Sequence, residues 1–312
     1  MTKSFHESRP THHNRRHALA AGVATTSLAA LGPPVLAQQQ QRQADDKRNR
    51  ICAFIKFVQD LPYDELAERI AEMGFDGIEA TVRNGGHVLP ERVEDDLPKL
   101  VEALEKHGLE ISVMASNVNS VKQPLTEKVL RTAARLGVRT YRMGYYRYDA
   151  KRPVAKQIDE LRPVVRDLAQ MNRELKLRAV YQNHAGASSV GAPIWDIYEL
   201  LRRHSVKEIG VAFDIRHATV EGGLAWPLHF NVVQPVLGAV YVKDFVWNES
   251  ARPVNVPLGE GRVDRRFFKL LGESKYSGLI SLHVEYLPKA GLAKNLQALR
   301  DDLATLRKLL KA

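Results

Sequence analysis

The sequence predicts an α/β fold, a single-domain (β/α)8 barrel over residues 51–312, and three observations support it. Short apolar runs alternate with longer amphipathic stretches throughout this region. The pair occurs eight times, which is the number of units in a closed parallel barrel, the TIM barrel. No linker or change of composition interrupts the series, and its length suits one such barrel of about 250 residues. An open doubly wound sheet is the alternative, but no glycine-rich phosphate motif follows the first apolar run.

The eight apolar runs have the length and composition of buried strands. They cover residues 51–58, 77–82, 110–116, 140–146, 177–183, 209–214, 238–245 and 279–286. The stretches after them carry apolar residues at helical spacing. They cover residues 63–74, 91–108, 125–137, 155–176, 193–205, 224–236, 264–274 and 291–310. Three of these helices end at Gly74, Gly108 and Gly137, where glycine commonly closes a helix before the next strand.

Residues 1–37 are predicted to be a cleavable signal peptide of the twin-arginine type. Arg15 and Arg16 precede a short alanine-rich apolar stretch that ends in small residues at Ala37, the order expected of an exported precursor. Residues 38–50 would then be a disordered lead to the barrel. A disordered basic tail is the alternative, and the apolar stretch is too short for a membrane span. We therefore expect a periplasmic or secreted protein, exported by the twin-arginine pathway, with no membrane anchor after cleavage.

Charge and cysteine content narrow the expected function. The formal net charge is +10, but the basic residues are scattered along helix-like segments without aromatic interleaving, so no nucleic-acid partner is expected. The single cysteine, Cys52, excludes an internal disulfide, and its place in the first apolar run indicates packing. A small molecule is the expected partner, and the sequence is compatible with a homo-oligomer.

Polar side chains gather at the C-terminal ends of the predicted strands, the face that carries the active site of a (β/α)8 barrel. They are Glu79, Arg83, His87, Arg142, Tyr145, Gln182, His184, Asp214, His217, Tyr241, Lys243, His283 and Glu285. Gln182 and His184 share one face of a strand because side chains alternate with period two. Four histidines at one rim, with carboxylates beside them, favour a site over isolated structural histidines.

These side chains have the chemistry of proton transfer and of sugar or metal binding. Catalytic roles are predicted for Glu79, Lys243, His283 and Glu285. Substrate contacts are predicted for Arg83, His87, Arg142, Gln182, Tyr241 and Glu260. The predicted metal ligands are His184, Asp214, His217 and His283. Nitrogen and oxygen donors suit Zn²⁺, Mn²⁺ or Co²⁺, and such an ion would polarise a sugar carbonyl.

Lys243 supports an alternative without a metal. An ammonium in the same mouth repels a cation, but it would stabilise the oxygen of an enediolate or bind a carboxylate. Lys243 and the histidines would then handle the proton, with Glu285 or Glu79 as the base. The sequence leaves both versions open.

From about residue 51 to residue 310, the sequence resembles the xylose isomerase-like barrels. The segments that carry the resemblance are GFDGIEATV, YQNH, FDIRH, VKDF, PLGEGRVD and ISLHVEY. The family includes sugar phosphate isomerases and epimerases, inosose dehydratases and, more distantly, endonuclease IV. The resemblance implies a (β/α)8 barrel with four metal ligands, Glu, Asp, His and Glu, from the fifth to the eighth strand.

The chain departs from that pattern at three of the four implied ligand positions. Asp214 matches the aspartate of the sixth strand. Gln182, Tyr241 and His283 stand where the pattern has Glu, His and Glu. A glutamine keeps the oxygen of a glutamate but loses its charge and basicity, so proton transfer must move to another residue. The residues that match the wider pattern are His217, Lys243, Asp244 and the loop Gly259-Glu260-Gly261.

The resemblance and the rim residues together predict an exported sugar isomerase or epimerase. It would act by proton abstraction next to a carbonyl, on a non-phosphorylated or oxidised sugar, with or without a divalent metal. A sugar lyase or dehydratase of the same fold shares this first step. A carbohydrate-binding barrel that has lost catalysis is the alternative from another class. A nuclease of the endonuclease IV type needs more metal ligands than this rim supplies.

Overall fold

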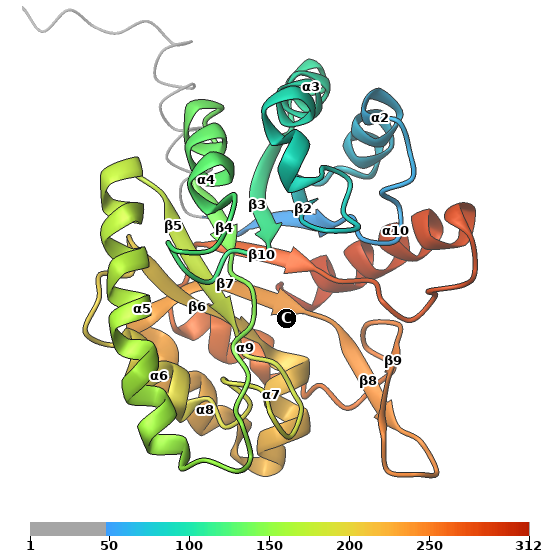
Figure 1. The fold of residues 1–312 in the computed structure, drawn as a ribbon. Helices are drawn as coiled ribbons and strands as arrows, with labels where there is room; N and C mark the ends of the chain where they lie inside the picture. Colours follow the sequence, from blue (N-terminus) through green and yellow to red (C-terminus); the bar gives the residue numbers. More distant parts are fainter. Residues whose placement is uncertain (1–47, 312) are drawn as a thin grey trace, which may run out of the picture. The chain divides into compact units, whose positions relative to one another are not determined.

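The computed structural model describes residues 48–311, and these form a closed barrel of eight parallel strands (Figure 1). The order around the barrel is β1-β10-β7-β6-β5-β4-β3-β2. The strands are β1 (Arg50–Phe54), β2 (Gly77–Val82), β3 (Glu110–Ser116), β4 (Thr140–Arg142), β5 (Arg178–Gln182), β6 (Ile209–Asp214), β7 (Leu237–Val242) and β10 (Leu279–Leu282). The predicted (β/α)8 fold is confirmed.

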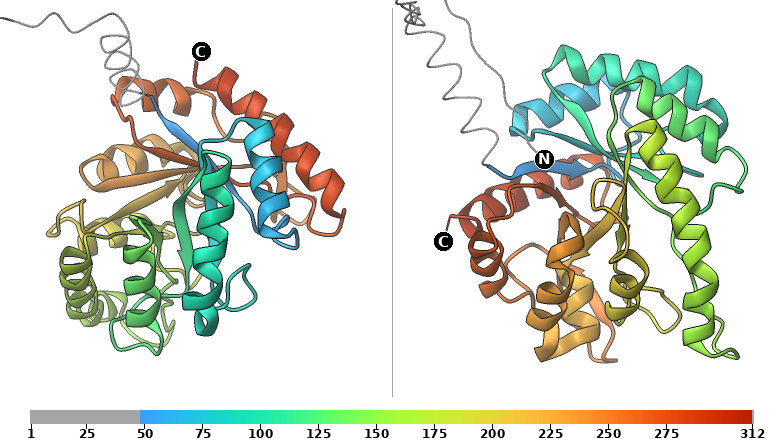
Figure 2. Two further views of the ribbon diagram at one scale, coloured as in Figure 1. Left: turned by 90° about the horizontal axis from the view of Figure 1, so that it is seen from above. Right: turned by 90° about the vertical axis from the view of Figure 1, so that its left-hand side faces the viewer.

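Within residues 48–311, eight helices lie in the stretches predicted for them and cover the outside of the barrel (Figure 2). They are α2 (Tyr63–Met73), α3 (Val93–Lys106), α4 (Thr126–Arg135), α5 (Val154–Leu175), α6 (Trp195–Leu201), α8 (Trp226–Val233), α9 (Arg266–Glu273) and α10 (Leu292–Leu309). In α3 the buried residues Leu97, Leu100 and Leu104 recur every three or four positions, as an apolar stripe requires. Gly74 closes α2 at a φ of 82°, a left-handed conformation that glycine adopts without strain.

The inside of the barrel is apolar below and polar at the mouth. Val180, Ala212 and Ala239 form one buried cluster with Tyr241, and Cys52 packs in another with Val113. Two residues further along β5 and β6, the same strand face presents polar side chains because alternation has period two. Burial raises the pKa of the Cys52 thiol far above its usual value. Cys52 is therefore a packing residue, as its sequence position indicated.

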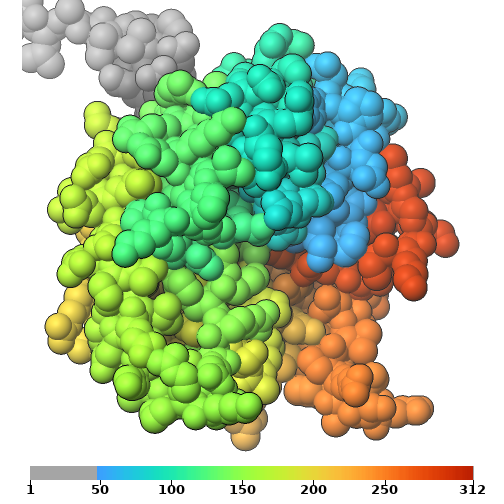
Figure 3. Space-filling view, viewed as in Figure 1, coloured from blue at the N-terminus to red at the C-terminus, as the bar shows by residue number. Residues whose placement is uncertain are grey.

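The mouth contains three elements that the sequence pattern did not predict: α7 (Ile215–Gly222), β8 (Asp244–Trp247) and β9 (Pro253–Val256). Helix α7 follows β6 without a loop because the Asp214 carboxylate caps it, accepting a hydrogen bond from the His217 backbone N–H. The run predicted as one strand over 238–245 is interrupted at Lys243, between β7 and β8. Strand β8 pairs with β9 in an antiparallel ribbon. This ribbon projects from the body of the barrel (Figure 3). The part of the chain that the structure describes also has three short 3₁₀ turns, at Pro90–Arg92, Gly223–Ala225 and Gln234–Val236.

The predicted signal peptide, residues 1–37, lies outside the described residues and stays a prediction. The same holds for most of the predicted lead over 38–50, although its last residue, Arg50, is the first residue of β1. Within residues 48–311, no helix is both long and apolar enough to cross a membrane.

Candidate active site

A cavity of about 140 Å³ lies at the C-terminal ends of the strands. Seven predicted site residues line it: Arg83, Arg142, Gln182, His184, Lys243, His283 and Glu285. Phe54, Lys56 and Tyr145 complete the lining. Phe54 and Lys56 were not singled out from the sequence, because the first apolar run was predicted to extend to residue 58, whereas β1 ends at Phe54. A larger cavity of about 460 Å³ lies at the N-terminal ends of the strands, the face that carries stability rather than chemistry in such barrels.

Glu79 lies buried behind the cavity and not in its lining. Arg142 Nε donates to its Oε1 over 2.8 Å, while Ser281 Oγ and His283 Nε2 donate to its Oε2 over 2.6 and 3.0 Å. Burial alone would raise the pKa of this carboxyl, but Arg142 and His283 outweigh burial and lower it to about 2. With both oxygens engaged, Glu79 positions Arg142 and His283. The structure thus places this predicted catalytic residue one layer behind the cavity.

Gln182 connects the Arg142 guanidinium to the Asp214 carboxylate. Its Oε1 accepts from Arg142 Nη1 over 2.9 Å and from Tyr145 Oη over 2.5 Å. Its Nε2 donates to Asp214 Oδ2 over 2.7 Å. A glutamate at this position would set a carboxylate oxygen against Asp214 at that distance, which like-charge repulsion opposes. The amide is therefore the side chain that this network requires.

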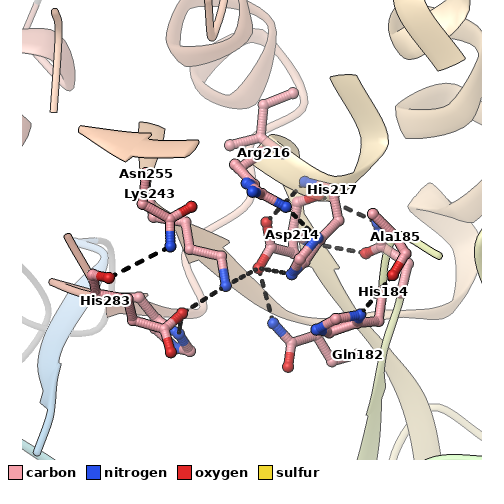
Figure 4. Close-up of polar contacts among 12 residues, drawn as sticks. Gln182, His184, Ala185, Asp214, Arg216, His217, Lys243, Asn255 and His283 are labelled. Carbon is pink, nitrogen blue, oxygen red and sulfur yellow. Dashed lines mark hydrogen bonds and ion pairs between the residues drawn. The ribbon is translucent and has the colours of Figure 1, made fainter. Parts of the chain in front are cut away.

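Lys243 points toward Asp214 (Figure 4) and links this buried carboxylate to Glu285. Its Nζ lies 2.8 Å from Glu285 Oε2 and 3.3 Å from Asp214 Oδ2. Burial would lower the pKa of the ammonium, but Asp214 and Glu285 more than offset this and raise it. Burial likewise opposes ionisation of Glu285, yet Lys243 holds the pKa of that carboxyl well below its usual range. Burial would raise the pKa of Asp214 too, but its charged neighbours, Lys243 among them, lower it, so all three groups are charged at neutral pH.

The His184 and His217 rings pack together, with centroids 4.0 Å apart. His184 Nδ1 lies 2.8 Å from the Ala185 carbonyl oxygen, which only accepts, so Nδ1 carries the proton and Nε2 keeps a free lone pair. His217 Nδ1 accepts from Arg216 Nη1 over 3.0 Å, which places the proton on Nε2. Burial lowers the pKa of both imidazoles, so both are neutral at neutral pH.

Asp244 organises the Gly259-Glu260-Gly261 loop and does not reach the cavity. Its carboxylate accepts hydrogen bonds from four backbone N–H groups, those of Phe245, Gly259, Gly261 and Val263, over 2.8–3.0 Å. A Cβ at Gly261 would lie 2.1 Å from Asp244 Oδ1, so only glycine fits there. The motif that sequence reasoning associated with substrate binding thus forms a structural loop.

Three predicted substrate contacts lie outside the cavity lining. Glu260 is exposed on the loop just described. The His87 Nε2 atom lies 3.0 Å from the Leu61 carbonyl oxygen, and its ring packs edge-on against Tyr63. Tyr241 is completely buried beneath the cavity floor, and its hydroxyl has no hydrogen-bond partner among the described residues.

A divalent ion, which the family pattern implies, does not fit this donor set. Of the residues at the four implied positions, only Asp214 is a carboxylate. Both its oxygens are engaged, by the His217 backbone N–H and by Gln182, and the Lys243 ammonium stands 3.3 Å from Oδ2. The other predicted set, His184, Asp214, His217 and His283, is not assembled either, since His283 donates to Glu79.

Within residues 48–311, no group of three or more His, Cys, Asp or Glu side chains is arranged to hold a metal ion. The positive charge that an ion would supply is present instead in the Arg142 guanidinium and the Lys243 ammonium, both in the cavity lining. The structure therefore shows a (β/α)8 barrel whose mouth holds a cavity lined by cationic and acid–base side chains.

The sequence also matches a family model described as xylose isomerase-like TIM barrel, over residues 67–309. The chain therefore belongs to this family. Among curated proteins, none matches it.

Several solved structures share the fold at low sequence identity. The 3-keto-D-glucoside 4-epimerase of E. coli superposes with a TM-score of 0.63 at 18% identity, covering 84% of this chain and 100% of its own. A putative xylose isomerase of Rhodospirillum rubrum gives 0.66 at 16%, covering 84% and 98%. A probable 3-DHS dehydratase of Bacillus anthracis gives 0.61 at 14%, covering 80% and 98%. At these identities the likeness shows the fold.

Proposed function

We propose that the chain is an exported sugar isomerase or epimerase that removes a proton next to a carbonyl and stabilises the resulting enediolate without a bound metal. Lys243 carries this proposal, because its nearly buried ammonium joins Glu285 and Asp214 in the wall of the cavity. The family, and the epimerases and isomerases among the similar structures, support a sugar substrate. Export to the periplasm by the twin-arginine pathway rests on residues 1–37, and it favours a non-phosphorylated or oxidised sugar.

The cations of the lining provide the electrophile. When a base takes the proton, negative charge develops on the neighbouring carbonyl oxygen, and fixed donors in a water-poor site stabilise it strongly. Lys243 and Arg142 both present donors to the cavity. Glu79 and Gln182 hold the guanidinium in place, so little reorganisation is needed during the reaction.

Two acid–base groups stand on different walls. Glu285, after β10, is ionised and has a partly exposed side chain in the lining. His184, after β5, presents a neutral imidazole whose Nε2 lone pair is free. Strands β10 and β5 are separated around the barrel by β7 and β6. An epimerase needs such a pair, because the proton leaves one face of the carbon and returns to the other.

The test is solvent exchange by the full chain in D₂O after treatment with a chelator. Ketoses, aldoses and sugar acids are offered in turn, and NMR detects deuterium at the carbon next to the carbonyl. We expect incorporation without added metal, loss of at least about 100-fold in Glu285→Gln, and no change in Glu174→Gln, a matched substitution on the exposed face of α5.

Other outcomes distinguish the alternatives. Sugar binding without exchange would identify a carbohydrate-binding barrel, and an unsaturated product would identify a lyase or dehydratase. Exchange that disappears with the chelator and returns with Zn²⁺, Mn²⁺ or Co²⁺ would contradict the metal-free mechanism.

A further inference from the structure

Arg83 differs from the other cations of the cavity lining because it has no carboxylate partner. Lys56 pairs with Glu285 over 3.3 Å, and Lys243 pairs with the same carboxylate over 2.8 Å. Arg142 pairs with Glu79 over 2.8 Å. Among the described residues, no hydrogen bond or ion pair is made by the Arg83 guanidinium, whose one contact of note is the Phe54 ring, 5.8 Å from Cζ to the centroid.

The cations that line the cavity outnumber the carboxylates in and behind the lining by one. Four cations line it, Lys56, Arg83, Arg142 and Lys243, against one carboxylate in the lining, Glu285. Two further carboxylates, Glu79 and Asp214, lie behind and pair with Arg142 and Lys243. The lining and its supporting carboxylates therefore sum to four positive and three negative charges. Arg216 lies outside the lining, where its Nη atoms donate to His217 and to the Pro253 carbonyl oxygen.

The turn after β2 holds Arg83 at the rim. The Arg83 backbone N–H donates to the Val88 carbonyl over 3.1 Å, and its carbonyl accepts from Gly86 N over 2.8 Å. Gly86 permits this turn, since a Cβ there would lie 2.6 Å from the Thr81 carbonyl oxygen. The Phe54 ring, itself stacked on His283, packs against the guanidinium. Arg83 is thus a half-buried residue at the rim, and its guanidinium donors make no bond to the described residues and are left for a ligand.

We propose that Arg83 binds the carboxylate of an oxidised sugar, so that the substrate is a sugar acid and not a neutral sugar. This inference rests on the proposed function for the sugar part of the substrate. A carboxylate matches the planar donors of a guanidinium in a two-point contact, and its single charge balances the surplus of the lining. A phosphate dianion would bring a second negative charge next to Glu285.

Calorimetric titration of the full chain tests this assignment. The ligands are D-glucuronate, D-galacturonate and D-mannuronate, their neutral hexoses, and glucose 6-phosphate. We expect at least one uronate to bind about 10- to 100-fold more tightly than its hexose, the range of a charged two-point contact. Arg83→Gln should bring the two within about 2-fold, and Arg83→Lys should keep part of the preference. Arg131→Gln, on the exposed side of α4, should leave the preference unchanged.

Thermal melts of the variants are the control that each one is folded. The assignment is overturned if no uronate binds more tightly than its hexose, or if the preference for the uronate survives in Arg83→Gln. It is also overturned if glucose 6-phosphate binds more tightly than every uronate. Deuterium exchange on the same ligands separates the two proposals. Uronate binding that depends on Arg83 but gives no exchange would support the carboxylate site and contradict the proposed isomerase or epimerase activity. Exchange on neutral sugars alone would support the activity and contradict the carboxylate site.

Discussion

The barrel mouth and the Gly259-Glu260-Gly261 loop after β9 surround buried carboxylates with different partners. In the mouth, Glu79 and Asp214 each lie against a cation, Arg142 and Lys243 respectively. At this loop, Asp244 accepts hydrogen bonds from four backbone N–H groups and forms no ion pair within residues 48–311. Backbone donors are thus sufficient to bury a carboxylate in this protein. The cations of the mouth are therefore not needed for burial as such, which fits a role in chemistry.

Asp302 on α10 is a buried carboxyl whose pKa shifts in the opposite direction to those of the mouth carboxylates. It accepts hydrogen bonds from the Leu258 backbone N–H and from Tyr286 Oη, both over 3.2 Å, so it ties α10 to the same loop. Burial dominates here and raises the pKa of Asp302 to about 7, with Asp301 and Glu260 adding to the rise. The mouth carboxylates shift the other way because each has a cation beside it.

The largest effect is expected for Lys243→Met. Loss of the ammonium removes a donor to the developing enediolate oxygen, so kcat for exchange should fall by about 10²–10⁴, with a much smaller change in KM. Lys56→Met is the matched variant, because Lys56 pairs with the same Glu285 but its side chain is 41% exposed. It should lose less than about tenfold, as exposed ion pairs contribute little. Equal losses in the two variants would show that the pairing, and not the position of Lys243, matters.

Asp244→Ala should give the largest loss of stability. Four backbone N–H groups would lose their acceptor in a buried site, which we expect to lower the free energy of unfolding by about 3–5 kcal/mol. Denaturant unfolding followed by circular dichroism measures it. Asp159→Ala, on an exposed position of α5, should change stability by less than about 0.5 kcal/mol. A change of the same small size in Asp244→Ala would contradict the structural role of the loop.

Asp302→Asn should raise the free energy of unfolding above neutral pH, by less than Asp244→Ala lowers it. The folded protein keeps the Asp302 proton up to pH about 7, whereas the unfolded chain loses it above pH about 4. Wild-type stability therefore declines as pH rises through this window, and asparagine removes the decline while keeping the accepting oxygen. At pH 8 the variant should be more stable by on the order of 1–3 kcal/mol, and the difference should vanish near pH 4. Melting temperatures across this range would decide; a difference independent of pH contradicts the prediction.

The barrel itself could be predicted because it depends on local patterns. Each strand and helix of the eight units has its own periodicity and glycine punctuation, as at Gly74, and the count of eight then closes the barrel. Strand ends were predicted too long at the mouth. The run over 238–245 stops at Val242, because Lys243 leaves the ladder to meet Glu285 and β8 begins a ribbon.

The composition of the site could also be predicted, since polar residues at strand ends face the mouth of such a barrel. The hydrogen-bond and ion-pair partners of these residues could not be predicted. Gln182 contacts Arg142, 40 residues before it, and Asp214, 32 residues after it, so its bridging role exists only in the folded barrel. The same holds for Glu79, which looked like a base and lies behind Arg142, one layer from the cavity.

By itself, the sequence determined the fold and the end of the barrel at which the polar side chains gather, because these depend on residue types and their spacing. The tertiary structure alone decided which charges meet. It paired Arg142, Lys56 and Lys243 with carboxylates, and it left Arg83 without one among the residues that the structure describes. It also placed the Gly259-Glu260-Gly261 loop around the Asp244 carboxylate. The physical reason is that a buried charge is defined by neighbours within a few ångströms, and these come from strands far apart in the chain.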